Sequence, residues 1–145
     1  MNTKVAQSEH AMESLPLSNK RVWAGRILSG LSVAFLLFDA LVKVFAAPMV
    51  AEASAELGYP ASAIRGIGIT LLVSVVTYAL PRTSVLGGVL LTGYLGGAIA
   101  THVRVGNPLF SHVLFPVYVA AMIWGGLFLR DERLRVFLPW HEPRG

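Results

Sequence analysis

The chain has 145 residues, of which 54% are hydrophobic and 14% charged, and its formal net charge is +4. Its mean hydropathy of +0.62 excludes an ordinary water-soluble domain and indicates a protein of the lipid bilayer. The absence of cysteine excludes disulfides, thiolate metal sites and a cysteine nucleophile, and basic residues placed beside hydrophobic runs do not indicate nucleic-acid binding.

The two ends of the chain are predicted to be tails. Residues 1–21 are polar and lack the basic start and apolar stretch of a cleaved signal peptide, so we predict a disordered cytoplasmic tail there. Residues 140–145 are predicted to form a second, flexible tail. The membrane domain is expected between them, over 22–139, with its first hydrophobic run serving as an uncleaved signal anchor.

Four apolar runs in this domain are long enough to span a membrane, because about 20 apolar residues cross a bilayer core of about 30 Å. They lie at about 23–46, 64–80, 84–103 and 109–129. The connections "PRT" and "RVGNP" are short, so the helices that they join must be antiparallel. The sequence therefore predicts an all-α polytopic membrane protein, built as an antiparallel four-helix transmembrane bundle.

The segment "APMVAEASAELGYP" separates the first two spans. Pro48 suits the start of a helix, Glu52 and Glu56 lie one turn apart, and Gly58 and Pro60 form a stop signal. We predict a short helix at the membrane interface, with an irregular polar loop as the alternative.

The basic residues are distributed unevenly between the two sides of the predicted bundle. One side carries Lys4, Lys20, Arg21, Arg26, Arg82, Arg130, Arg133, Arg135 and Arg144. The other side has Arg65 and Arg104 flanking its spans, together with two glutamates. The positive-inside rule predicts that both termini are cytoplasmic, and we expect the membrane to be a bacterial inner membrane.

Ionisable residues gather at the outer ends of the spans, namely Asp39, Lys43, Arg65, His102 and His112. Asp39 and Lys43 are one helical turn apart, with the acid first, and each is hard to bury in an apolar setting without the other. Two interpretations stay open. The pair either neutralises itself for structural reasons, or it faces a cavity and handles a ligand or a proton.

The two histidines lie on either side of the turn "RVGNP", so they are expected on facing helices. They could bond backbone carbonyls, or act in headgroup binding or a proton relay in which Asp39 orients one imidazole. Metal or haem ligation is a further alternative, but no His, Asp or Glu run has a ligand spacing, so we predict no metal site and no resident cofactor. Tyr94 is expected either to line a pocket or to pack.

Two further features concern helix packing. Gly93 and Gly97 have GxxxG spacing, which predicts close packing of helices within the chain, with a homodimer contact as the alternative. Pro116 frees a carbonyl in the fourth span and is expected to bend it.

Three stretches carry a resemblance to a known family: "LGYP" (57–60), "LPRTSVLGGVLLTGYLGGAIATHVRVGNPLF" (80–110) and "LRDERLRVFLP" (129–139). They resemble the DoxX-like branch of the DoxX family of small membrane proteins, over roughly residues 22–139. The resemblance implies a four-helix membrane bundle. The family takes its name from a subunit associated with a terminal quinol oxidase and thiosulfate:quinone oxidoreductase, and other members are linked to oxidative-stress complexes, so a redox or other membrane complex is the implied partner.

The leading functional hypothesis is an accessory, non-enzymatic membrane protein with a polar, outward-facing pocket for a lipophilic, quinone-like ligand. The residues expected to contact the ligand are Asp39, Lys43, Arg65, Tyr94, His102 and His112. One alternative is a membrane enzyme in which a histidine performs acid/base chemistry and Lys43 or Arg65 stabilises negative charge. Another is a structural subunit whose polar layer docks a partner membrane protein.

Overall fold

The structure of the protein is a computed structural model that describes residues 19–132 and 134. Residues 1–18 and 140–145 of the two predicted tails lie outside this part of the chain, whereas residues 19–21 already belong to the first helix. Every regular element over the described residues is helical. This confirms the predicted all-α fold class.

Four long helical segments carry the four apolar runs. They are α2 (Asn19–Val44), α4 (Ala61–Ala79), α5 (Ser84–Arg104), and a π-helical turn η1 (Leu109–Val113) that continues into α6 (Phe115–Arg130). The shortest has 19 residues, which is close to the length of about 20 that crosses a bilayer. Because a helix satisfies its own backbone hydrogen bonds, it is the form that an isolated apolar run takes in lipid.

The outer faces of these helices are apolar. Between 22% and 33% of each span is buried inside the protein, and large side chains such as Trp23, Leu31, Phe38, Val73 and Leu86 point outward. Exposing such surface to water would cost about 25 cal/mol per Å², a cost that lipid tails remove. The protein is therefore an integral membrane protein.

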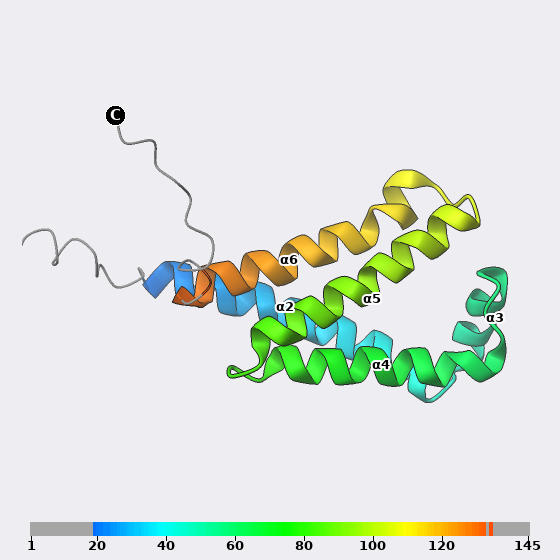
Figure 1. Cartoon of the computed structure of the whole chain (residues 1–145), viewed down its shortest axis with the longest axis horizontal. Coiled ribbons are helices and arrows are strands. Elements are labelled where there is room, and N and C mark those ends of the chain that lie inside the picture. The colour runs from blue at the N-terminus through cyan, green and yellow to red at the C-terminus, as the bar shows by residue number, and fades with distance from the viewer. Residues whose placement is uncertain (1–18, 133, 135–145) are drawn as a thin grey trace, which may run out of the picture.

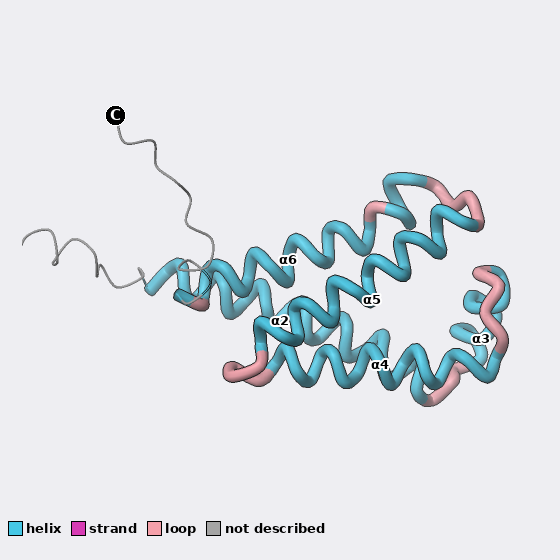
Figure 2. Tube along the Cα trace, in the orientation of Figure 1, coloured by secondary structure: helices cyan, strands magenta, loops and turns pink. Residues whose placement is uncertain are grey.

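The four helices form a bundle in which α2 and α5 lie diagonally opposite. Each of these two contacts both α4 and α6. The start of α2 and the end of α6 lie together at one end, which we call the terminal end, and the turn between α4 and α5 is at this end as well (Figure 1). Figure 2 shows the loops that join α2 to α3, α3 to α4 and α5 to η1 at the opposite end, which we call the α3 end.

The short helix predicted between the first two spans is present as α3 (Pro48–Glu56) and lies across the α3 end (Figure 1). Pro48 occupies its first turn, where no backbone N–H is needed. It ends where Gly58 adopts φ 78°, a conformation that residues with a Cβ rarely take.

The terminal end is tightly packed around Tyr78, which is 1% exposed. Its hydroxyl donates to the carbonyl of Ile123 at 2.9 Å and accepts from Ser29 Oγ at 2.9 Å. One buried phenol thus links α4 to both α2 and α6, with its own polar atom satisfied. The Arg130 guanidinium lies 5.2 Å from the centre of the same ring.

The fourth span changes helix type near Pro116, the residue expected to bend it. The π-helical turn ends at Val113, and α6 begins at Phe115 with Pro116 in its first turn. Because proline has no backbone N–H, the α-helical hydrogen bonds cannot run through this position, and a new helix start accommodates it. The change places Pro116 at the α3 end, beside the cavity described next.

Candidate functional site

A cavity of about 440 Å³ lies at the α3 end and receives side chains from all four spans and from the α3–α4 region. Its apolar walls include Phe35, Leu36, Ile64, Ile67, Leu95 and Val119. Its polar lining includes Asp39, Lys43, Tyr59, Tyr94, Thr101 and His102. A volume of this size, with apolar walls and a few polar groups, is typical of sites that hold small molecules.

The Asp39–Lys43 pair forms on successive turns of α2, as predicted. Lys43 Nζ donates to Asp39 Oδ1, and the two side chains are 20% and 34% exposed, respectively. Both line the cavity. The pair therefore neutralises itself and faces a cavity at the same time, so the two interpretations drawn from the sequence do not exclude each other.

Gly68 allows α4 to approach this pair closely, and the sequence reasoning missed it. A Cβ at Gly68 would lie 2.8 Å from Lys43 Cβ and 2.8 Å from the backbone nitrogen of Val44. Because Gly68 has no side chain, α4 packs directly against the end of α2. This close contact fixes the position of Lys43. Spacing alone did not reveal this role, because Gly68 stands in an otherwise ordinary apolar run.

His102 lines the cavity, but its orientation has a different cause from the predicted one. Asn107 Nδ2 donates to His102 Nδ1 at 2.8 Å, which leaves the imidazole hydrogen on Nε2. Asp39, the expected partner, is bonded to Lys43 instead. The turn that brings Asn107 back to the helix end passes through Gly106 at φ 71°.

His112 lies beside His102 without lining the cavity. The two rings meet edge to face, with their centres 5.7 Å apart. His112 is exposed, and its Nδ1 is bonded to the neighbouring Ser111 hydroxyl at 2.8 Å. The predicted proximity of the two histidines is confirmed, but one of them faces the cavity and the other does not.

Arg65 is exposed on α4 and does not line the cavity. The five polar residues expected in one layer therefore separate into Asp39, Lys43 and His102 at the cavity, and Arg65 and His112 away from its walls. Helix rotation decides this. A residue at the correct depth can point away from the bundle axis, and depth is what hydropathy predicts.

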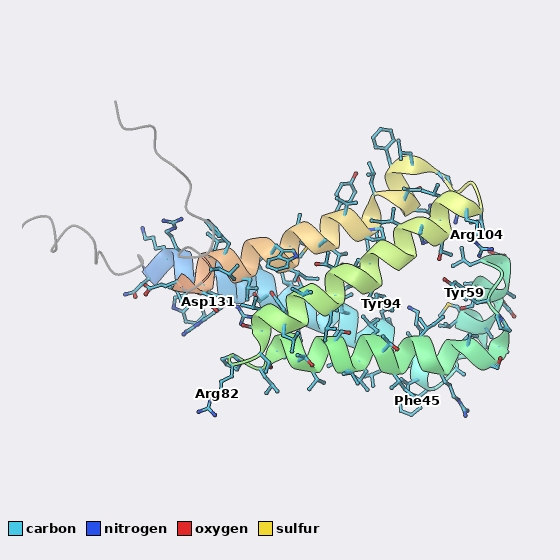
Figure 3. All side chains as sticks on the ribbon, in the orientation of Figure 1. Phe45, Tyr59, Arg82, Tyr94, Arg104 and Asp131 are labelled. Atoms are coloured by element: carbon cyan, nitrogen blue, oxygen red, sulfur yellow. The ribbon has the colours of Figure 1, made fainter. Side chains whose placement is uncertain are left out.

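Tyr59 and Thr101 are cavity residues that the sequence reasoning missed. The Thr101 hydroxyl donates to the carbonyl of Gly97 at 2.9 Å, so the Tyr59 hydroxyl is the donor in the 2.7 Å bond between Tyr59 and Thr101. Arg104 Nη2 donates to the carbonyl of Leu57 at 2.6 Å. These two bonds tie the segment after α3 to the end of α5. Figure 3 shows Tyr59 and Arg104 at this end of the bundle, and Tyr94 farther along α5 toward the terminal end.

The GxxxG glycines do not pack closely, contrary to the expectation for Gly93 and Gly97. Both line the cavity, and a Cβ on either would find no atom of the described neighbours within 4 Å. Close helix contacts occur instead at Gly25, Gly68, Gly87 and Gly126. The GxxxG spacing identifies small residues on one helix face, but it does not predict which face packs against a neighbouring helix.

Over residues 19–132 and 134, no group of three or more His, Asp or Glu side chains is arranged to hold a metal ion. The polar chemistry of the cavity is that of hydrogen bonding: an imidazole, hydroxyl groups and one internal ion pair. Such groups can orient a small polar head by donating to and accepting from it.

A known protein family matches most of this chain. The family model described as the DoxX-like family matches residues 27–126. No curated protein and no solved structure matches the chain. The matched range begins on α2, includes the whole of α3, α4 and α5, and ends within α6, so it contains every residue named above as lining the cavity.

Proposed function

The chain belongs to the DoxX-like family, and from that premise we propose that it is an accessory membrane protein that binds a lipophilic, quinone-like molecule in its cavity. The observation that carries the proposal is the cavity itself, which is large enough for a small ring and combines apolar walls with polar groups from three parts of the chain. The family association with quinone-linked complexes supports the choice of ligand and of a redox membrane complex as partner.

The polar groups suit an uncharged ring that carries oxygen atoms. His102 presents an N–H at Nε2. The Lys43 ammonium group donates to Asp39 and has further hydrogens that can be donated to a carbonyl oxygen of the ligand. Asp39 can accept a hydrogen bond from a hydroxyl, as in a reduced quinol. Because the two charges in the lining belong to one pair, the site favours a neutral head over an anion.

The cavity is proposed to face the outer half of a bacterial inner membrane, with both termini in the cytoplasm. At the terminal end the described basic residues are Lys20, Arg21, Arg26, Arg82 and Arg130, and at the α3 end they are Lys43, Arg65 and Arg104. Lys43 is paired with Asp39, and α3 adds two glutamates. This asymmetry supports the proposed orientation.

The test is retention of a ligand during purification in mild detergent, measured by mass spectrometry on folded, monodisperse protein. We expect a lipophilic molecule to co-purify with the wild-type chain. Asp39→Asn and His102→Gln should each lower the amount retained by about five- to tenfold, since a hydrogen bond contributes on the order of 1 kcal/mol net.

His112→Gln is the matched control, because His112 is the neighbouring histidine but does not line the cavity. It should retain the ligand as the wild type does. Equal loss of ligand in all three variants would reject the assignment of the polar groups, and a folded wild type that retains nothing, even when offered decylubiquinone, would reject the proposed function.

A further inference from the structure

Neighbouring spans meet along four seams, and the two seams that involve α2 are closed by contacts at the depth of the cavity. Between α2 and α4, Gly68 lies against the backbone of Lys43 and Val44. Between α2 and α6, the rings of Phe35 and Phe115 meet with their centres 5.6 Å apart.

The third seam, between α5 and the fourth span, is held by contacts on either side of the cavity. Trp124 Nε1 donates to Thr92 Oγ1 at 2.8 Å, just on the terminal side of the cavity. On the opposite side, the rings of His102 and His112 meet. This seam is therefore bridged on both sides of the cavity by side chains of the two spans themselves.

The seam between α4 and α5 differs. Near the turn that joins these helices they touch, because a Cβ at Gly87 would lie 2.2 Å from the backbone nitrogen of Tyr78. Toward the α3 end the two helices diverge (Figure 1). There Gly97 is exposed, lines the cavity and has no described atom within 4 Å of its Cβ position.

Gly97 lies on the flank of α5 that faces the α3–α4 segment. It is one turn before Thr101 on the same face of the helix, and Thr101 is the residue that Tyr59 contacts. The cavity therefore reaches the outer surface along this flank. Because the outer surface of a span faces lipid tails, the opening at Gly97 connects the cavity with the hydrocarbon part of the bilayer.

The same seam is closed again at its outer end by the two hydrogen bonds from Tyr59 to Thr101 and from Arg104 to Leu57. Gly58 lies between Leu57 and Tyr59, the two residues of this segment that make these bonds. A Cβ at Gly58 would lie 3.3 Å from Arg104 Nη2. This tight contact holds the segment 57–60 against the end of α5. The α4–α5 seam is therefore closed at its outer end, one turn beyond the opening at Gly97.

We propose that the cavity loads from the bilayer through the α4–α5 seam beside Gly97, with the Tyr59–Thr101 bond as the closure of its outer end. The inference rests on the proposed function and adds the class of ligand that the route admits. That class is an amphiphile with an uncharged polar head that reaches Asp39, Lys43 and His102, and with an alkyl chain that trails through the seam into the lipid. A water-soluble metabolite has no such route.

The experiment measures loading rates of decylubiquinone into the full-length protein in phosphatidylcholine nanodiscs. Trp124 serves as the reporter, in a background carrying Trp23→Phe and Trp140→Phe, and the signal is the saturable part of its fluorescence quenching. Gly97→Leu places a side chain in the open seam. We expect it to lower the loading and release rates by about tenfold each, while the Kd changes by less than about threefold.

Gly96→Leu is the matched control, since Gly96 is also exposed with no described atom near its Cβ position but does not line the cavity. It should load at the wild-type rate. Tyr59→Phe removes the hydroxyl that bonds Thr101 and should raise both rates, the opposite of Gly97→Leu.

The possible outcomes distinguish a failure of the proposed entry route from a failure of the proposed function. Saturable binding with equal rates in Gly97→Leu and Gly96→Leu would overturn the route and leave the proposed function standing. Slower loading in Tyr59→Phe would likewise contradict the closure. A wild-type protein without saturable quenching would reject both the proposed function and the route.

Discussion

At the scale of single residues, the Asp39–Lys43 pair shows how a membrane helix can carry charge. The two side chains meet within one helix, so the pair needs no neighbouring helix to form. In lipid an unpaired charge is expensive, and pairing within α2 lowers that cost during insertion. The cavity then gains two charged groups without gaining net charge.

The pair predicts coupled effects of substitution on stability. Removing one partner of a fully buried pair costs about 3–5 kcal/mol. Asp39 is 34% exposed and Lys43 20%, so we expect about 1–2 kcal/mol for Asp39→Asn or Lys43→Met alone, reduced by solvent screening. The double variant should lose less than the sum. Thermal unfolding in detergent measures this, and strictly additive losses would show that the two residues act independently.

At the scale of helices, glycines decide which spans touch. Gly25 and Gly126 allow α2 and α6 to meet, Gly68 allows α4 to reach α2, and Gly87 allows α5 to reach α4. In lipid there is no hydrophobic force between helices, so close backbone contact supplies much of the association energy. Gly93 and Gly97, which line the cavity and have no described atom within 4 Å of the Cβ position, lie where α4 and α5 have separated (Figure 1).

Alanine substitutions at Gly87 and at Gly96 of α5 should therefore have very different effects on stability. A Cβ at Gly87 would lie 2.2 Å from Tyr78 N and 2.3 Å from Tyr78 Cα, and backbone cannot move aside as a side chain can. We expect Gly87→Ala to lose at least about 2 kcal/mol of stability.

Gly96→Ala, on the same helix but in open space, should be neutral or gain up to about 1 kcal/mol from helix propensity. The midpoint of thermal unfolding, followed by circular dichroism, compares the two. Similar midpoints for both variants would mean that α4 and α5 do not approach closely at Gly87.

At the scale of the whole molecule, the two ends of the bundle differ in packing and in charge. The terminal end is closed around Tyr78 and its hydrogen bonds, and it carries most of the described basic residues. The α3 end holds the cavity. A bundle that is tight at one end and open at the other can keep its fold while one half binds a ligand, because the packing contacts and the site are separated along the membrane normal.

This difference predicts a fixed orientation, which single cysteines can report because the chain contains none. Ser62 is exposed at the α3 end, and Glu132 is exposed at the terminal end. In intact bacterial cells a membrane-impermeant thiol reagent should label Ser62→Cys and should reach Glu132→Cys after permeabilisation. The reverse pattern would place the termini outside and the cavity in the inner half of the membrane.

The features that the sequence by itself determined are local along the chain. The four spans follow from apolar runs, because in lipid each segment must satisfy its own backbone hydrogen bonds. The ion pair follows from an i, i+4 spacing within one helix. The stop after α3 follows from Gly58, whose conformation is a property of that residue.

What only the tertiary structure decided depends on how each helix is rotated and tilted against its neighbours. Tyr59 and Thr101 are 42 residues apart yet share a hydrogen bond, and His102 lines the cavity while His112, at the other side of the same turn, does not. Gly87 touches a helix and Gly97 does not, although both are small residues of one span. Rotation and tilt arise from the sum of many weak packing contacts between helices, and no spacing within a single helix encodes that sum.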